Sequence, residues 1–122
     1  RDFCLSRGLG DVYKRQFYFN EMAPRPHNSG HYSIEALDHS QYDLFARYLL
    51  DLPYEEPKIM HKAIMKNILG RDLINVDYYL KYPKSYLHMY FKEEARAKRK
   101  MGHITFLDMD LDTFMAIEKG ME

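Results

Sequence analysis

Side chains that could bind anions gather in one short segment near the start of the chain. Asn20 and Glu21 are followed, across two prolines, by Arg25 and His27. A carboxylate is a hard oxygen ligand suited to magnesium, and an arginine presents a permanent, forked cation to an oxyanion. A histidine can donate to an anion or move a proton near neutral pH. An anion site is one interpretation; composition alone favours the other, a surface loop whose histidines cap turns.

A second cluster is cationic and lies toward the C-terminus. Five lysines and arginines fall within nine residues and precede Met101-Gly102-His103: Lys92, Arg96, Lys98, Arg99 and Lys100. On a hairpin, such charges can clamp a phosphate. A solvated turn is the commoner explanation of a charge run.

The six histidines do not suggest a zinc site. His27 and His31 are four residues apart, but the prolines beside them exclude the helix on which that spacing would matter. His61, His88 and His103 are scattered over strand candidates.

The elements that must position these groups follow from apolar periodicity. Residues 17–22 are predicted to form a strand that leads into an irregular loop ending at His31. Ser40 is the predicted N-cap of a helix, with Asp43 in its first turn. Periodicity and turn residues indicate further elements: helices over 40–51, 77–81 and 110–119, and strands over 59–69, 86–92 and 101–107. Residues 96–100 would join the last two strands as a hairpin connection.

The composition excludes several classes of protein. Eighteen basic and eighteen acidic residues balance in a chain of 122, so neither nucleic acid nor a membrane is an expected partner. Cys4 is the only cysteine, which excludes an intramolecular disulfide. No apolar run approaches the roughly 20 residues that span a bilayer, and no secretory signal opens the chain, so a cytoplasmic location is expected.

The first sixteen residues differ from the rest. Ser6–Gln16 corresponds to a translation of the transposase adapter used to make sequencing libraries, so residues 1–16 are interpreted as an artefact outside the fold. A natural glycine-containing loop is the alternative. Without this segment, 14 basic and 16 acidic residues remain, and the natural part would begin at Phe17.

Four ordered motifs resemble those of one enzyme family, the 5-(carboxyamino)imidazole ribonucleotide synthases, which are ATP-grasp ligases. Asn20-Glu-Met-Ala-Pro-Arg-Pro-His-Asn-Ser-Gly-His31 resembles the signature loop of the family. Three shorter motifs follow in the family's order: Ala63-Ile-Met-Lys-Asn-Ile-Leu-Gly70, Leu87-His-Met-Tyr-Phe-Lys92 and Arg99-Lys-Met-Gly-His103. The resemblance covers Phe17 to about Leu107.

The resemblance implies an ATP-dependent ligase of purine biosynthesis. Its reaction carboxylates 5-aminoimidazole ribonucleotide with bicarbonate, giving 5-carboxyaminoimidazole ribonucleotide, ADP and phosphate. ATP and Mg²⁺ are the implied cofactors; aminoimidazole ribonucleotide, bicarbonate and ATP are the implied ligands of a homodimeric enzyme. Another ATP-grasp carboxylase, a formyl-phosphate-using enzyme and a non-catalytic β-rich binding module are the alternatives.

The resemblance also implies roles for both clusters. Glu21 would bind magnesium and, with Asn20, border the ATP phosphates. Arg25 and His27 would hold bicarbonate or carboxyphosphate. The hairpin cations Lys92, Arg99 and Lys100 would face the ribonucleotide phosphate or the transferring phosphoryl group. Lys100 would also have a catalytic role. The two clusters are therefore expected to line one cleft.

The implied fold class is α+β. The end of an ATP-grasp domain would occupy residues 17–56, and a small C-terminal β-rich, barrel-sandwich-like domain residues 57–122. The chain departs from the family's pattern where glycine is expected at Phe91, Pro-Gly at Ala97-Lys98 and an apolar residue at Lys66. The adenine pocket and the other metal ligand would lie upstream, so this chain alone is expected to be inactive.

Overall fold

The computed structural model describes residues 22–120. The segment 1–16, residues 17–21 of the predicted strand, and the candidate ligands Asn20 and Glu21 lie outside these residues.

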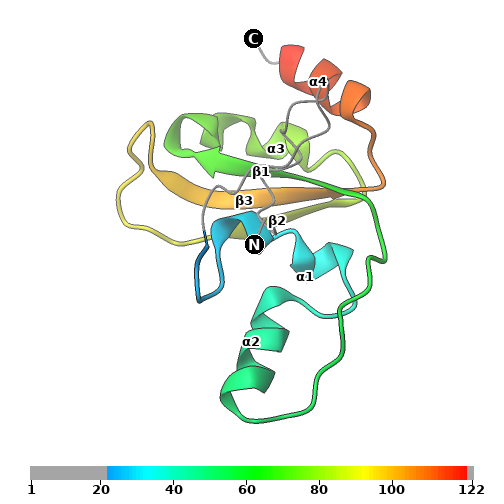
Figure 1. The fold of residues 1–122 in the computed structure, drawn as a ribbon. Coiled ribbons are helices and arrows are strands. Elements are labelled where there is room, and N and C mark those ends of the chain that lie inside the picture. Colours follow the sequence, from blue (N-terminus) through cyan, green and yellow to red (C-terminus); the bar gives the residue numbers. More distant parts are fainter. Residues whose placement is uncertain (1–21, 121–122) are drawn as a thin grey trace.

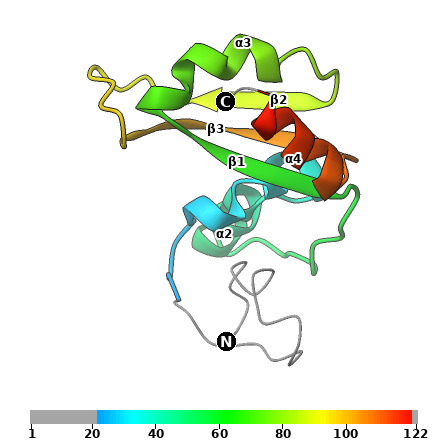
Figure 2. The same cartoon turned by 90° about the horizontal axis from the view of Figure 1, so that it is seen from above.

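One antiparallel sheet forms the centre of the described structure (Figures 1 and 2). Its strands are β1 (Ala63–Leu69), β2 (Ser85–Met89) and β3 (Lys100–Leu107), arranged in the order β1-β3-β2. The central strand β3 is the most buried, as its β-branched and aromatic residues favour. The three strands predicted within the described residues are confirmed, although β1 begins four residues later and β2 ends three residues earlier than predicted.

The two faces of the sheet carry different side chains, because successive residues of a strand point to opposite faces. Ile104 and Phe106 pack with Ile68 into the hydrophobic core. The helices α3 (Val76–Tyr79) and α4 (Leu111–Lys119) cover this face (Figure 1). His103 and Thr105 alternate with these core residues and point to the opposite face.

The opposite face is covered by the N-terminal part of the described chain. α1 (Ser33–Ala36) lies against β3, and α2 (Gln41–Leu49) follows it (Figure 1). 3₁₀ segments precede α1 at Asn28–Gly30 and follow β1 at Gly70–Asn75. No described helix is both long and apolar enough to cross a membrane.

The predicted starts of two helices, at Ser40 and Asp110, are confirmed by their caps. The Ser40 hydroxyl accepts from the Asp43 N–H, and the Asp43 carboxylate accepts from the Ser40 N–H, which forms a capping box for α2. Asp110 caps α4 through the Thr113 N–H at 2.7 Å. These contacts satisfy amide groups that have no partner within the helix.

The prediction of fold class holds at the level of a mixed α and β structure. The barrel-sandwich arrangement is not confirmed, since the described strands form a single three-stranded sheet. The proposed division at residue 56 is untested; residues on both sides of it pair, through the bridge between Leu37 and Ile59.

Lys66, where the family pattern predicts an apolar residue, has a partner in α4. Its Nζ lies 2.7 Å from Oε2 of Glu118, and the Tyr79 hydroxyl donates to Oε1 of the same carboxylate at 2.7 Å. Burial, followed by Glu118, raises the pKa of Tyr79, which keeps the hydroxyl protonated as a donor. The ammonium is therefore accommodated beside the core by one carboxylate that binds two donors.

Glu118→Ala is expected to lower the free energy of unfolding by about 2 kcal/mol, because it leaves two partly buried donors without an acceptor. Adding Lys66→Met should recover part of the loss, since no unpaired charge then remains. Urea unfolding of the single and double variants measures both effects. A loss below about 0.5 kcal/mol in the single variant would mean that the carboxylate stabilises nothing.

Candidate functional site

The basic cluster lies in the turn that joins β2 to β3. Lys92 Nζ donates to the Lys100 carbonyl at 2.8 Å and lies 5.6 Å from the centre of the Tyr90 ring. Arg99 donates to the carbonyl of Glu94 at 3.2 Å. Lys92 and Arg99 thus bind the backbone of the turn. All five cations of the cluster except Lys92 are exposed.

Gly70 fixes the position of this turn. The Gly70 N–H donates to the Arg99 carbonyl at 2.9 Å, and the Arg71 N–H donates to the Ala97 carbonyl at 3.2 Å. A Cβ built on Gly70 would lie 2.2 Å from the Arg96 carbonyl oxygen. The close approach of the two backbones therefore requires glycine here.

The backbone conformation at Phe91 bears on one departure from the family pattern, in which glycine is expected at this position. Phe91 has φ 49°, in the left-handed region that favours glycine, and its side chain is 92% exposed. The backbone thus keeps the conformation that a glycine would adopt without strain, and the phenyl ring gains little from packing.

Phe91→Gly is therefore expected to stabilise the chain by about 1 kcal/mol, because L-residues are strained in this region. The gain should appear as a higher urea midpoint with an unchanged slope. Tyr86→Gly, at a residue of β2 with extended geometry, is the control and should destabilise. A destabilised Phe91→Gly variant would show that the exposed ring contributes more than the strain costs.

The loop from Ala23 to His31 carries the other predicted site residues. Arg25 is exposed and donates one N–H to the Pro26 carbonyl at 3.2 Å. Nδ1 of His27 lies 2.9 Å from the Ser29 hydroxyl and accepts from the Ser29 N–H at 3.3 Å, which caps the 3₁₀ turn. The turn-capping role that composition favoured for His27 is thus present.

Three histidines connect this loop to the sheet, and we call them the imidazole column: His31, His88 and His103. The His31 and His103 ring centres are 4.8 Å apart, and those of His88 and His103 are 4.6 Å apart. His88 pairs with the Glu35 carboxylate of α1, and Nδ1 of His103 lies 2.8 Å from the Tyr90 hydroxyl. The column spans from the loop to strands β2 and β3.

Burial disfavours the charged form of two members of the imidazole column. Burial lowers the pKa of His103 to about 4, and the neighbouring His31 and His88 lower it further. Burial also lowers the pKa of His31, followed by the influence of His88, His27 and Lys100. His27 and Lys100 therefore both influence the His31 ring.

The structure thus relates the two clusters through shared neighbours. Residues 22–30 (blue) and the turn between β2 and β3 (yellow) lie toward the same end of the sheet in both views (Figures 1 and 2). Lys92 reaches the imidazole column through Tyr90, and the His27 backbone shares the Gln41 amide with the His31 ring. Whether Arg25 and Arg99 share a ligand with them stays a prediction.

The metal prediction depends on Glu21, which lies outside the described residues. Among residues 22–120, no group of three or more His, Cys, Asp or Glu side chains could hold a metal ion.

Sequence reasoning underrated several residues that build this region. His88 and His103 were interpreted as scattered, yet they are direct cross-strand partners in the register of β2 and β3. The predicted hairpin joined these two strands, but its register, which pairs the two histidines, was not specified. Tyr90 lies in one of the family motifs, but no role was assigned to it or to Gln41, because their contacts depend on segments distant in sequence.

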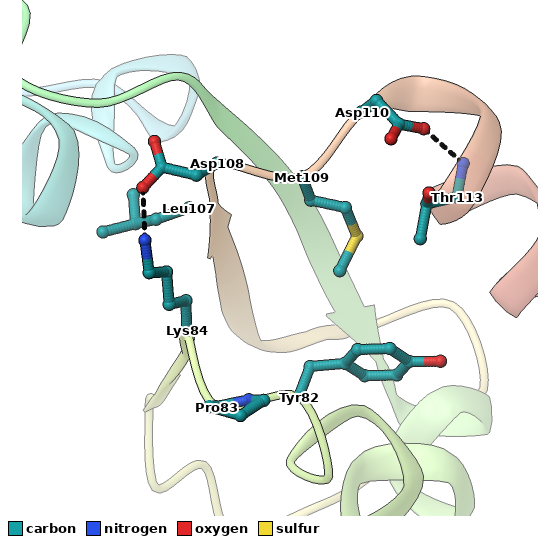
Figure 3. A pocket seen from close by; sticks show the side chains of 8 residues that line it. All are labelled: Tyr82, Pro83, Lys84, Leu107, Asp108, Met109, Asp110 and Thr113. Carbon is teal, nitrogen blue, oxygen red and sulfur yellow. Dashed lines mark hydrogen bonds and ion pairs between the residues drawn. The ribbon is translucent and has the colours of Figure 1, made fainter.

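Two cavities border the described structure. One of about 250 Å³ lies beside the loop and is lined by His27, Tyr32 and His39, among others. The other, of about 360 Å³, lies at the far end of β3 between Tyr82, Met109 and the start of α4 (Figure 3). There Lys84 pairs with Asp108 at 2.6 Å, and Asp110 turns toward Thr113 as its cap (Figure 3). This second cavity contains none of the predicted site residues.

Comparison with known proteins finds the same family in sequence and in structure. Residues 63–116 match the family described as the phosphoribosylaminoimidazole carboxylase C-terminal domain, and residues 12–42 match the ATP-grasp domain. The N5-carboxyaminoimidazole ribonucleotide synthase of Staphylococcus saprophyticus is 45% identical over 102 residues, which cover 81% of this chain and 27% of that protein. The chain belongs to this family of synthases.

Solved structures of N5-carboxyaminoimidazole ribonucleotide synthases agree with the assignment. The Staphylococcus aureus synthetase is 39% identical with a TM-score of 0.78, covering 88% of this chain and 30% of that one. The Aspergillus clavatus synthase, solved with ADP and 5-aminoimidazole ribonucleotide, is 36% identical with a TM-score of 0.68, covering 79% and 28%. The chain therefore spans about a quarter to a third of the length of these relatives.

Proposed function

We propose that this chain is the part of an ATP-dependent ligase that binds the carboxylating anion and the substrate phosphate. The whole enzyme would carboxylate 5-aminoimidazole ribonucleotide with bicarbonate, forming 5-carboxyaminoimidazole ribonucleotide, ADP and phosphate in purine biosynthesis. The observation that carries the proposal is a run of contacts from the signature loop to the basic turn. The His31 ring stacks on His103, Nδ1 of His103 lies 2.8 Å from the Tyr90 hydroxyl, and the Lys92 ammonium lies over the Tyr90 ring.

The chemistry requires this concentration of cations. Transfer of the γ-phosphoryl group of ATP to a bicarbonate oxygen gives carboxyphosphate; the substrate amine then bonds to its carbon, phosphate leaves and the amine loses a proton. Each of these species is anionic, and fixed donors that face developing negative charge lower such barriers. Arg25 and His27 are proposed to hold bicarbonate or carboxyphosphate. Lys92, Arg99 and Lys100 are proposed to face the ribonucleotide phosphate or the transferring phosphoryl group.

The nucleotide side of the site would come mainly from residues outside this chain. Asn20 and Glu21 are proposed to border the ATP phosphates, with Glu21 as a magnesium ligand. Magnesium would offset the charge of the phosphates when bound. A cytoplasmic location and a homodimeric enzyme stay predictions from the resemblance.

A hybrid synthase tests the proposal. Residues 17–120 of this chain would replace the corresponding part of the Staphylococcus saprophyticus synthase, and ADP release would be measured with and without bicarbonate and aminoimidazole ribonucleotide. We expect release that depends on both compounds. The proposed function would be contradicted by a hybrid that is folded and binds ATP, but whose ADP release is the same with and without both compounds.

A further inference from the structure

Gln41, the first residue of α2, uses every polar atom of its side chain on the signature loop. Its Oε1 accepts from the His27 N–H at 2.9 Å, and its Nε2 donates to the His27 carbonyl at 2.9 Å. The same nitrogen lies 2.9 Å from Nδ1 of His31. The amide therefore pairs with the His27 backbone on both sides, as a neighbouring strand would, and its remaining N–H reaches the imidazole column.

We call these contacts of the Gln41 amide with His27 and His31 the clamp. The backbone of Gln41 is itself held in place. The Gln41 N–H donates to the buried Ser33 hydroxyl at 2.9 Å, and that hydroxyl donates to the Gly30 carbonyl. A Cβ on Gly30 would lie 2.3 Å from Oε1 of Gln41. The loop therefore leaves room for this amide at position 30, where a larger residue would displace it.

The clamp continues into the sheet. His31, which receives the second N–H, stacks on His103, and His103 is only 2% exposed on the central strand. Tyr90 contacts both His103 and, through its ring face, the Lys92 ammonium. A displacement of the Gln41 amide would consequently change the position of His27 relative to the basic turn.

We propose that Gln41 is a positioning residue, whose amide fixes the His27 backbone against the imidazole column and so sets the distance between the loop and the basic turn. It acts through His27 and is not itself a catalytic residue. The identity of the bound anion rests on the proposed function, whereas the clamp does not. Glutamate cannot replace it: a carboxylate accepts from the His27 N–H but has no N–H for the His27 carbonyl or for His31.

NMR of the 122-residue chain tests the clamp. Gln41→Met should speed hydrogen exchange of the His27 N–H at least about tenfold, because local opening then costs less. Gln41→Glu should keep that amide protected but raise the pKa of His31 by about one unit, since a carboxylate would face its ring. Tyr42→Phe is the matched control: it removes the other contact of His31 Nδ1, at 3.0 Å, and should leave exchange at His27 unchanged.

Binding of inorganic phosphate, followed on the Lys92 and Lys100 side chains, gives the functional readout. Both Gln41 variants should bind phosphate several-fold more weakly than the unmodified chain and Tyr42→Phe. Unchanged His27 exchange in Gln41→Met, together with an unchanged His31 pKa in Gln41→Glu, would overturn the inference, as would altered exchange with full phosphate affinity. An unmodified chain that binds no phosphate would count against the proposed anion site, while the exchange and pKa data would still decide the clamp.

Discussion

Arg25→Lys in the hybrid synthase is expected to lower bicarbonate-dependent ADP release roughly a hundredfold, equivalent to about 3 kcal/mol of lost transition-state stabilisation. Lysine keeps the charge but loses the planar fork that can hold two oxygens of bicarbonate or carboxyphosphate together. ATP binding should be nearly unchanged, because the nucleotide is expected to be held mainly by residues outside this chain. Initial rates over a range of bicarbonate concentrations measure the effect.

Glu21→Gln serves as the contrasting variant. It should weaken magnesium-dependent ATP use whether or not bicarbonate is present, because it removes a proposed metal ligand instead of an anion donor. If Arg25→Lys matched the unmodified hybrid at every bicarbonate concentration, Arg25 would be a residue that shapes the loop, consistent with its hydrogen bond to Pro26.

Gly70→Ala should lower the free energy of unfolding by about 2 to 3 kcal/mol, because a methyl group must displace the backbone at Arg96. The basic turn would then move away from β1, and its hydrogen bonds to Gly70 and Arg71 would weaken. Urea unfolding measures the loss, and hydrogen exchange at Arg71 reports where it occurs.

Gly120→Ala is the matched control, since a Cβ there meets its nearest atom at 3.5 Å, an ordinary contact distance. It should change stability by less than about 0.5 kcal/mol. Equal effects of the two substitutions would show that the close approach of the turn is not the reason for glycine at position 70.

Local signals predicted most of the secondary structure correctly. The capping box of Ser40 and Asp43, and the cap at Asp110, lie within four residues of the groups they bind, so sequence alone identified both helix starts. β3 was recognisable because Ile104, Thr105 and Phe106 have high β-propensity, and the structure buries all three. α1 was missed, because its single turn follows a loop rich in proline and glycine.

The tertiary contacts of the site could be predicted only in part. The resemblance assigned His27 and Lys100 to one site, and that assignment stays a prediction. The imidazole column was missed because it depends on strand register, which apolar patterning alone did not specify. Lys66 departs from the family pattern, and the sequence did not indicate its partner, because Glu118 of α4 is 52 residues away.

The amphipathic helix over 40–51 shows a further limit of sequence patterns. Its apolar residues follow helical spacing, yet Phe45, Tyr48 and Leu49 are exposed among the described residues. Periodicity predicts that a helix has an apolar face, but it does not say which segment covers that face.

The central claim is that the signature loop and the basic turn line one anion site. A crystal structure of the hybrid synthase with ADP and aminoimidazole ribonucleotide tests it most directly. The account predicts that Arg25, His27 and Lys100 all lie within reach of one bound anion, with polar atoms about 3 Å from it or bridged to it by one water. A closed, liganded structure with the two clusters more than about 15 Å apart, beyond any shared hydrogen bond, would contradict it.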